Sequence, residues 1–560
     1  MLFSKSFYYF SWLLLIAVFC LGFLGLCFFL SLTSSSIFLD FSYSRFFSVD
    51  FRPVVILTPM RSLFSLVVLL ITGCVLVFSV YYIGRSVKTI YFTWFTVLFV
   101  FSILIVINFG DLFSIILGWD GLGVVSFFLI IYYQSPVSIY SGLITLFMNR
   151  LGDGLLLVAV VLLFYTSPSS LFIVGLRLIL SFSLLLGLCT KRALFPFSPW
   201  LPAAIAAPTP ISSLVHSSTL VTAGLYLMFR FSEYFYLSSS ICYFICISRV
   251  FTSFYAGLNS LVEIDLKKVV ALSTLRHLGF IGLSFSLGWL TLAYIHLISH
   301  AAFKSLLFMG LGRIIVSSGH YQDSRYLSGG SGLTPLSSSF ILVAVFSLLG
   351  FPFLRGFYSK DYILETLCFS PSIGWLQFMV YLNLFFTFSY AMRIFTSVYS
   401  FMKMNPMFVV PHYPLALSVS LGLLSFCSVV LISFWISAIS PTVIPLPVLS
   451  LVKFYPVFLS LFVLLGSLFI VKLYPALPSF VLNTFSSILF LSNLWANGSR
   501  RLFLWLVPNV NKSFEYGILN STLNLSLRSL VYSLSSVSLS LLTSVYFLLF
   551  LGLVFTVLLF

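Results

Sequence analysis

The chain has 560 residues, of which 61% are hydrophobic and only 7% carry a charge, whereas about a quarter of the residues in a soluble domain are charged. A soluble protein is therefore excluded. Lys and Arg number 28 against 12 for Asp and Glu, a formal net charge of +16, but the basic residues stand mostly at the ends of apolar segments, as Lys267 and Lys268 do. That distribution is typical of topology signals and lipid headgroup contacts, and it argues against nucleic acid as a partner.

Apolar segments long enough to cross a membrane recur along the whole chain. A membrane-spanning helix needs about 20 mostly apolar residues, so the sequence predicts an all-α polytopic membrane protein with about fifteen transmembrane helices. The predicted spans are residues 8–31, 63–83, 89–109, 112–133, 142–165, 171–190, 211–229, 239–258, 269–288, 290–312, 336–353, 374–392, 413–438, 454–471 and 537–560.

These spans divide the chain into five predicted parts. Residues 1–60 hold the N-terminal span and a Ser-rich extramembrane loop, residues 61–365 form a core, and residues 366–475 add further helices. Residues 476–536 alternate apolar and polar side chains, which predicts one or more amphipathic segments along the membrane surface. Residues 537–560 are the predicted C-terminal anchor.

Two segments interrupt the predicted helices. Residues 194–210 contain five prolines, and each proline removes an amide donor and clashes with the preceding turn. Residues 349–361 contain Gly350, Pro352 and Gly356. Broken helices at corresponding places in two halves are typical of inverted-repeat transporters, although ordinary re-entrant loops or kinks would look the same in sequence.

The segment "YIHLISHAAFKSLLFMG" places three titratable residues, His296, His300 and Lys304, in an otherwise apolar span. Their spacing of four puts them on one helix face, about 6 Å apart along the axis. An imidazole can accept a proton on one nitrogen and release one from the other, and a lysine in a low-dielectric interior loses its proton more readily than one in water. The pattern therefore predicts a proton path.

Other ionisable residues lie inside or beside the spans, where an unpaired charge costs several kcal/mol. Some of them could have a purely structural role. Lys191 could reach the membrane interface, His216 could be a hydrogen-bonded core residue and Asp361 could be a span-end charge. The set comprises Asp120, Asp153, Lys191, His216, Lys360 and Asp361.

No cofactor or metal site is predicted in this chain. The eight cysteines are scattered without CxxC spacing, so we expect them to be small core hydrophobes. No nucleotide-binding glycine motif is present. We also expect no cleavable targeting segment before residues 8–31, and the 66 phenylalanines suggest an organelle-encoded protein.

Several long motifs resemble one known family. "KRALFPFSPWLPAAIAAPTPISSLVHSSTLVTAGLYLMFR" (191–230) closely resembles the signature of subunit 5 of NADH:ubiquinone oxidoreductase, respiratory complex I. "GWDGLGVVSFFLIIYY", "NRLGD", "EIDLKKVVALSTLRHLG", "IHLISHAAFKSLLFM" and "RGFYSKDYILE" occur in that family's order. The resemblance covers residues 61–365, and the tail is similar to the family's lateral helix and anchor.

The resemblance implies an antiporter-like, proton-pumping subunit of the mitochondrial inner membrane, rather than of a bacterial plasma membrane. It implies other membrane-arm subunits and lipids such as cardiolipin as partners, with NADH, FMN, iron–sulfur clusters and ubiquinone held by other subunits. It assigns proton translocation to nine residues, with Asp120 standing where the family has Glu, as the acid partner of Lys191. The other seven are Asp153, His216, His296, His300, Lys304, Lys360 and Asp361.

Three features depart from the family pattern. Asp120 is one methylene shorter than Glu, Arg276 and His277 in "STLRHLG" stand where the family has small or amide residues, and the N-terminus is one predicted span short. Two alternatives stay open at this point. One is a subunit of a multi-subunit sodium/proton antiporter or a membrane-bound hydrogenase, and the other is a structural clamp of the membrane arm.

Overall fold

The structure, a computed structural model, describes thirteen stretches of the chain, and most of residues 53–399 fall within them. The described residues are 16–17, 20–26, 36–40, 45–46, 49–50, 53–84, 88–165, 173–236, 239–327, 330–351, 354–369, 374–399 and 415–431. The predicted spans at 454–471 and 537–560, the lateral helix at 476–536 and most of the span at 8–31 lie outside them.

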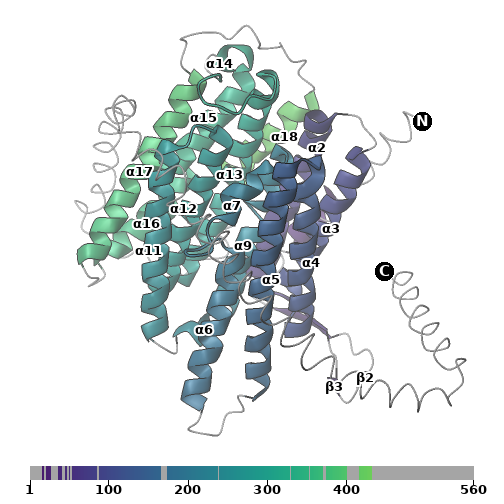
Figure 1. The fold of residues 1–560 in the computed structure, drawn as a ribbon, viewed down its shortest axis with the longest axis vertical. Helices are drawn as coiled ribbons and strands as arrows, with labels where there is room; N and C mark the ends of the chain where they lie inside the picture. Colours follow the sequence, from purple (N-terminus) through teal and green to yellow (C-terminus); the bar gives the residue numbers. More distant parts are fainter. Residues whose placement is uncertain are drawn as a thin grey trace, which may run out of the picture. The chain divides into compact units, whose positions relative to one another are not determined.

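The described part is predominantly helical (Figure 1), as an apolar chain in lipid must be, because only a helix or a closed barrel satisfies every backbone polar group there. Nine helical segments of the described part are long and apolar enough to cross a membrane, one of them being Thr209–Arg230, which contains two helices, and three shorter apolar helices accompany them. The main helices are α2 (Pro59–Ile83), α3 (Lys88–Asn108), α4 (Leu112–Ile130), α5 (Pro136–Tyr165), α6 (Ile173–Lys191), α8 (Thr209–Val215), α9 (Leu220–Arg230), α11 (Ser239–Val262), α12 (Leu266–Ser286), α13 (Leu290–Ser317), α15 (Pro335–Leu349), α16 (Arg355–Phe369), α17 (Gly374–Tyr399) and α18 (Leu415–Phe426).

Helix α13 is the centre of the described bundle. It is buried along almost its whole length, and it contacts α2, α8, α12, α15 and α16. Figure 1 shows it among these helices, away from the outer face. The predicted titratable stripe therefore lies on a helix that is surrounded by protein on all sides.

The first predicted break is present. Helix α6 ends at Lys191, and the chain then forms only short elements before α8: α7 (Trp200–Ala203) and the 3-10 turn η2 (Ala204–Ala206). The Trp200 indole nitrogen donates to the Thr190 carbonyl over 2.8 Å. This bond ties the broken segment to the C-terminal turn of α6.

A further interruption was not predicted. The expected span 211–229 is divided at residues 216–219, between α8 and α9. Hydroxyl side chains bond to backbone carbonyls here, with Thr219 donating to Leu214 over 2.7 Å and Thr222 donating to Ser218 over 2.6 Å. Such bonds compete with the helical hydrogen-bond ladder, and they account for the loosened turn.

The second predicted break is shorter than expected. Helix α15 ends at Leu349, Gly350 adopts a left-handed conformation with φ 81°, and α16 begins at Arg355. The prediction that the interruption extends to residue 361 is therefore wrong. Helix α16 starts early because Gly356 packs on α15, where a Cβ atom would come within 1.6 Å of the Ser347 carbonyl oxygen.

The predicted extramembrane loop before α2 contains short strands. Strand β1 (Ile37–Asp40) pairs antiparallel with β4 (Val54–Leu57), with Ile37 opposite Leu57. Strands β2 (Arg45–Phe46) and β3 (Val49–Asp50) form a second small hairpin. The Val54 amide donates to the Asp111 carboxylate over 2.7 Å, which links the loop to the start of α4.

Candidate functional site

The first cluster of charged side chains surrounds Lys191, the last residue of α6. Its side chain is fully buried, and its ammonium lies 3.6 Å from the Asp153 carboxylate of α5. The same ammonium donates to the Trp119 carbonyl over 2.5 Å and lies 3.9 Å from the centre of the Trp119 ring. A helix C-terminus also favours a positive charge, so four separate interactions position this lysine inside the bundle.

Glycines bring Asp153 to Lys191. A Cβ atom on Gly152 of α5 would lie 2.0 Å from the Thr190 hydroxyl and 3.0 Å from the Gly187 carbonyl oxygen of α6. Only glycine permits the two helices to approach so closely at this point. The "GD" sequence therefore has a physical meaning, because the glycine sets the helix contact and the next residue supplies the acid.

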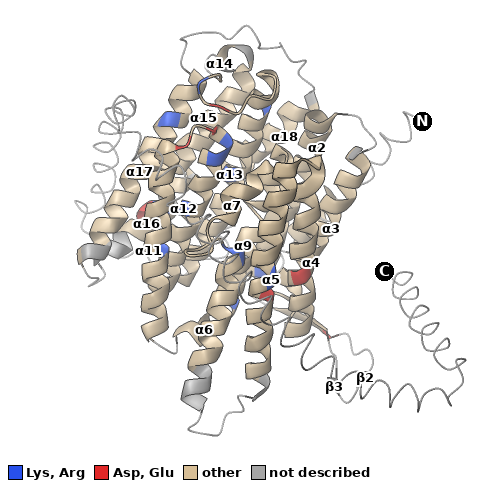
Figure 2. Ribbon diagram, viewed as in Figure 1, with Lys and Arg blue, Asp and Glu red and all other residues tan. Residues whose placement is uncertain are grey.

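Asp120 and Arg150 form the outer part of this cluster. The Arg150 guanidinium lies 3.6 Å from Asp153 and 3.8 Å from Asp120. No ion pair joins Asp120 to Lys191 directly, although the structure describes both residues. The acid that pairs with Lys191 here is thus Asp153, and Asp120 reaches it through Arg150. Figure 2 shows how sparse charged positions are elsewhere on these helices.

His216 lies at the end of α8, where the helix is interrupted. Its side chain is buried, its ring centre is 6.4 Å from that of Trp200, and neither ring nitrogen has a hydrogen-bond partner among the described residues. The interpretation of His216 as a core histidine with its hydrogen bonds satisfied by neighbouring hydroxyls is therefore not supported.

Lys267 is buried, although the sequence predicts that it stands, like Lys268, as a charge at the end of a span. Lys267 is only 3% exposed. Its ammonium donates to the carbonyls of Ile205, over 2.8 Å, and of Ala207, both in the first broken segment. Lys268, one residue on, pairs with Asp265 over 2.8 Å and has a side chain that is 42% exposed. Consecutive residues on a helix point about 100° apart, so one of these two lysines faces the bundle and the other does not. The charge pattern alone does not show which one points inward.

The titratable stripe on α13 is buried as predicted, since His296, His300 and Lys304 are each at most 1% exposed. Partners come from other helices. The Lys304 ammonium donates to the Ser273 hydroxyl of α12 over 2.6 Å, and His296 Nδ1 lies 2.9 Å from the Ser359 hydroxyl of α16. Neither nitrogen of His300 has a hydrogen-bond partner within the described part of the chain.

Lys360 lies on α16, next to Ser359 and directly after the second break. It is 4% exposed, and its ammonium donates to the Leu349 carbonyl over 3.2 Å and to the Thr387 hydroxyl of α17 over 3.3 Å. The Leu349 carbonyl is available because the helical ladder stops at Gly350. Asp361, the following residue, is only partly buried.

The arrangement is a series of buried amines and imidazoles on five helices of the described part, namely α6, α8, α12, α13 and α16, with hydroxyls beside several of them. This arrangement suits reversible protonation, because an amine or an imidazole can gain and lose a proton while no other bond is made or broken. The sequence does not single out Lys267, Ser359 or Thr387, since hydroxyls and span-end lysines are common in membrane helices and their contacts depend on which helices become neighbours.

Comparisons with known proteins are consistent across sequence and structure. A family model described as "NADH:quinone oxidoreductase/Mrp antiporter, TM" matches residues 110–387. NADH-ubiquinone oxidoreductase chain 5 of Lumbricus terrestris is 39% identical over 370 residues, which cover 64% of this chain and 64% of that protein. The match therefore spans slightly less than two thirds of that relative. The chain 5 of Ascaris suum is 38% identical over 471 residues, which cover 82% of each chain.

The fold has a counterpart among solved structures. A chain of the Mrp complex from Dietzia sp. DQ12-45-1b superposes with a TM-score of 0.71 at 21% identity, covering 92% of this chain and 60% of that one. At that level of identity, the likeness concerns the fold alone.

Proposed function

Because this chain belongs to the family of NADH-ubiquinone oxidoreductase chain 5, we propose that it is a proton-translocating core subunit in the membrane arm of respiratory complex I. In this role it couples electron transfer from NADH to ubiquinone, which takes place in other subunits, to proton movement across the membrane. We propose the mitochondrial inner membrane as its location. The chain is one subunit of an H⁺-translocating NADH:ubiquinone reductase, and its partners hold the redox centres.

One observation carries the proposal. Three lysines, Lys191, Lys304 and Lys360, are each at most 4% exposed and stand on three different helices of one bundle. Of these, only Lys191 has an ion pair within the described residues. Burying an amine without a counter-ion costs several kcal/mol if it stays charged, so a structural purpose does not account for them. A role in which each amine gains and loses a proton does account for the burial of these lysines.

The proposal assigns a role to each predicted site residue. Asp153 holds Lys191 protonated, and Arg150 and Asp120 adjust the strength of that pair from its exposed side. His216 links the Lys191 cluster toward α12 and α13, His296, His300 and Lys304 form the central relay, and Lys360 with Asp361 is the terminal element.

The finer architecture belongs to the same proposal. We propose that the two breaks belong to two antiporter-like inverted repeats, that the whole chain has about fifteen spans, and that residues 476–536 form a lateral helix with 537–560 as its anchor. That helix would contact the neighbouring antiporter-like subunits, and membrane lipids including cardiolipin would contact the basic span ends.

The alternatives have less support. The likeness to the Mrp complex is 21% in identity, against 36–46% for the curated chain 5 relatives, so a sodium/proton antiporter or hydrogenase subunit is disfavoured. A purely structural clamp would have no use for Lys304, which is fully buried with a serine hydroxyl as its hydrogen-bond partner.

Replacement of Lys191 tests the proposal. Lys191→Met keeps the length of the side chain but removes the charge, so we expect proton pumping by the assembled complex in sealed membranes to be suppressed. NADH:quinone turnover should fall with it, because the two are coupled. Proton uptake and NADH oxidation would be followed in the same preparation.

The matched control is Lys268→Met, the same substitution at a lysine whose side chain is 42% exposed. It should leave pumping close to the unsubstituted level. Normal pumping per NADH in Lys191→Met, with the subunit present in the complex, would contradict the proposed function.

A further inference from the structure

His277 of α12 lies between two residues of the α13 stripe. Its ring centre is 5.7 Å from that of His296 and 5.7 Å from that of His300, and its side chain is 3% exposed. Three imidazoles from two helices therefore form one buried group. The sequence motif "STLRHLG" singled out this position as a departure from the family pattern, without indicating where the side chain would point.

Tyr390 of α17 connects His277 to the lysine end of the stripe. Its hydroxyl lies 3.0 Å from His277 Nε2, and the face of its ring lies 5.8 Å from the Lys304 ammonium. Tyr390 is fully buried. The hydroxyl hydrogen-bonds the imidazole and so orients the His277 ring within this group.

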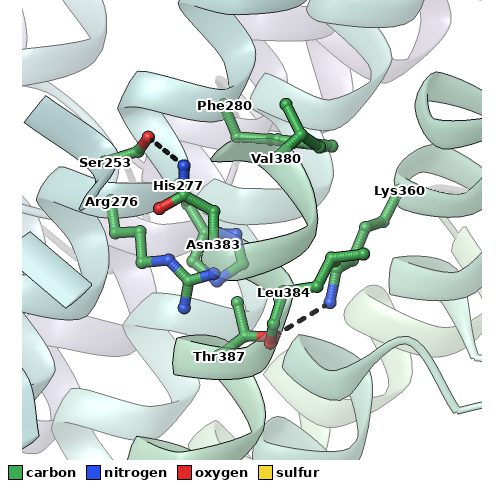
Figure 3. Close-up of a pocket in the computed structure, with 9 residues that line it drawn as sticks. All are labelled: Ser253, Arg276, His277, Phe280, Lys360, Val380, Asn383, Leu384 and Thr387. Carbon is green, nitrogen blue, oxygen red and sulfur yellow. Dashed lines mark hydrogen bonds between the residues drawn. The ribbon is translucent and has the colours of Figure 1, made fainter. Parts of the chain in front are cut away.

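A cavity opens on the other side of His277. Its volume is about 20 Å³, and the apolar residues Phe280, Val380 and Leu384 form part of its wall (Figure 3). The polar residues that line it are Ser253, Arg276, His277, Lys360, Asn383 and Thr387. A polar cavity needs about 10–15 Å³ to hold one water molecule, which takes two to four polar partners. This cavity is large enough for one.

The lining supplies partners for that water. Asn383 donates through Nδ2 to the Ser253 hydroxyl over 2.8 Å, which leaves its Oδ1 atom as an acceptor without another partner in the described residues. Arg276 likewise has two guanidinium nitrogens, Nε and Nη1, without a described partner. Lys360 enters the cavity from α16, on the side opposite Arg276 in Figure 3.

We propose that His277 is a proton-relay residue that joins the α13 stripe to Lys360 through water in this cavity. This inference rests on the proposed function and adds a residue and a route to it. In each passage His277 takes a proton on one ring nitrogen and releases one from the other, so its own charge is unchanged at the end. The water accepts one proton and releases another in the same balanced way.

A second route from the stripe to Lys360 is visible and must be separated from this one. His296 Nδ1 lies 2.9 Å from the Ser359 hydroxyl, and Ser359 precedes Lys360 on α16. That route does not use His277. If it alone carried protons, His277 would be a packing residue.

The test is His277→Gln in the full complex, reconstituted in sealed vesicles. Glutamine can still bond the Tyr390 hydroxyl but cannot exchange a proton at neutral pH, so packing is largely kept while the relay is removed. We expect the pumping rate to fall about tenfold, which is less than the roughly 10²–10⁴-fold that a positioned proton-transfer group typically contributes, because the Ser359 route remains. The matched control is His320→Gln in the exposed loop after α13, which should pump normally.

Two measurements distinguish a relay from a structural role. The first is the infrared difference spectrum between resting and turning-over complex, in which an imidazole protonation band should be lost in His277→Gln and retained in His320→Gln. The second is a high-resolution density map, which should show an ordered water between Lys360 and His277. Pumping at the unsubstituted rate in His277→Gln, or a pumping loss with the imidazole band intact, would overturn the inference.

Lys191→Met, run alongside, separates this inference from the proposed function. If Lys191→Met abolishes pumping while His277→Gln does not affect it, the His277 route is wrong and the proposed function stands. If both variants pump normally, both proposals are wrong.

Discussion

The two carboxylates nearest to Lys191 occupy different surroundings. The Asp153 side chain is 10% exposed and lies 3.6 Å from the Lys191 ammonium, whereas the Asp120 side chain is 41% exposed and pairs with an Arg150 that is itself 53% exposed. The Asp120–Arg150 pair is thus less enclosed by the described residues than the Asp153–Lys191 pair. Loss of one partner from a buried pair costs about 3–5 kcal/mol, since it leaves the other charge uncompensated.

We therefore expect Asp153→Asn to destabilise the subunit markedly and to lower proton pumping, because Lys191 then loses the acid that holds its proton. Thermal unfolding of the purified complex and pumping in sealed vesicles would measure the two effects. Asp120→Asn is the matched change and should alter the unfolding temperature little. An equal loss of thermal stability in both variants would show that Asp120 contacts the buried lysine after all.

At the residue scale, the helical period predicts which side chains share one face of a single helix. The spacing of His296, His300 and Lys304 predicted one shared face, and all three are buried. Periodicity said nothing about which side chains from other helices would meet that face, such as Ser273 and Tyr390. The inward direction of Lys267 was also missed, because a lysine at a span end has an obvious interfacial role.

Among the elements, the contact between α5 and α6 determines the geometry of the first cluster. Gly152→Ala would place a methyl group 2.0 Å from the Thr190 hydroxyl and 3.0 Å from the Gly187 carbonyl. Relieving this overlap requires the helices to separate, at a cost of about 1–3 kcal/mol. We expect reduced thermal stability and reduced pumping, since Asp153 moves away from Lys191 when α5 shifts.

Gly154→Ala provides the control on the same helix, because a Cβ atom there meets nothing within 4 Å. It should be neutral or slightly stabilising, as alanine is the better helix former. The same measurements apply to both variants. If Gly152→Ala matched Gly154→Ala in stability and pumping, the close helix contact would not be what positions the acid.

At the scale of elements, the sequence predicted the breaks that prolines and glycines impose and missed the one that hydroxyl side chains impose. Five prolines made the interruption at 194–210 evident. The interruption at 216–219 depends on serine and threonine bonds to carbonyls, and the same residues are tolerated inside other helices of this chain, as Ser273 and Ser284 are. Local composition does not separate the two cases.

At the scale of the molecule, four buried lysines lie on different elements of the part of the chain that the structure describes. Lys191 ends α6, Lys267 and Lys304 lie on the adjacent helices α12 and α13, and Lys360 lies on α16. The sequence predicts a proton path at Lys304 from its place in an apolar span, and the family resemblance adds Lys191 and Lys360. The sequence could not predict that hydroxyl, carbonyl and imidazole groups from other helices would lie between these lysines, because those neighbours are set by the packing of the entire bundle.

If these lysines serve one proton path, the losses of pumping caused by substitutions at its two ends should not multiply. Blocking a path at one point removes most of what a second block could remove, and residues that act as a unit show strongly non-additive effects. We expect Lys191→Met and Lys360→Met each to suppress pumping, and the double variant to pump no more slowly than the more severe single variant. All three would be compared at equal subunit content in sealed vesicles. A double variant whose loss equals the product of the two single losses would mean that the two lysines serve independent routes, and the bundle would then hold two proton paths instead of one.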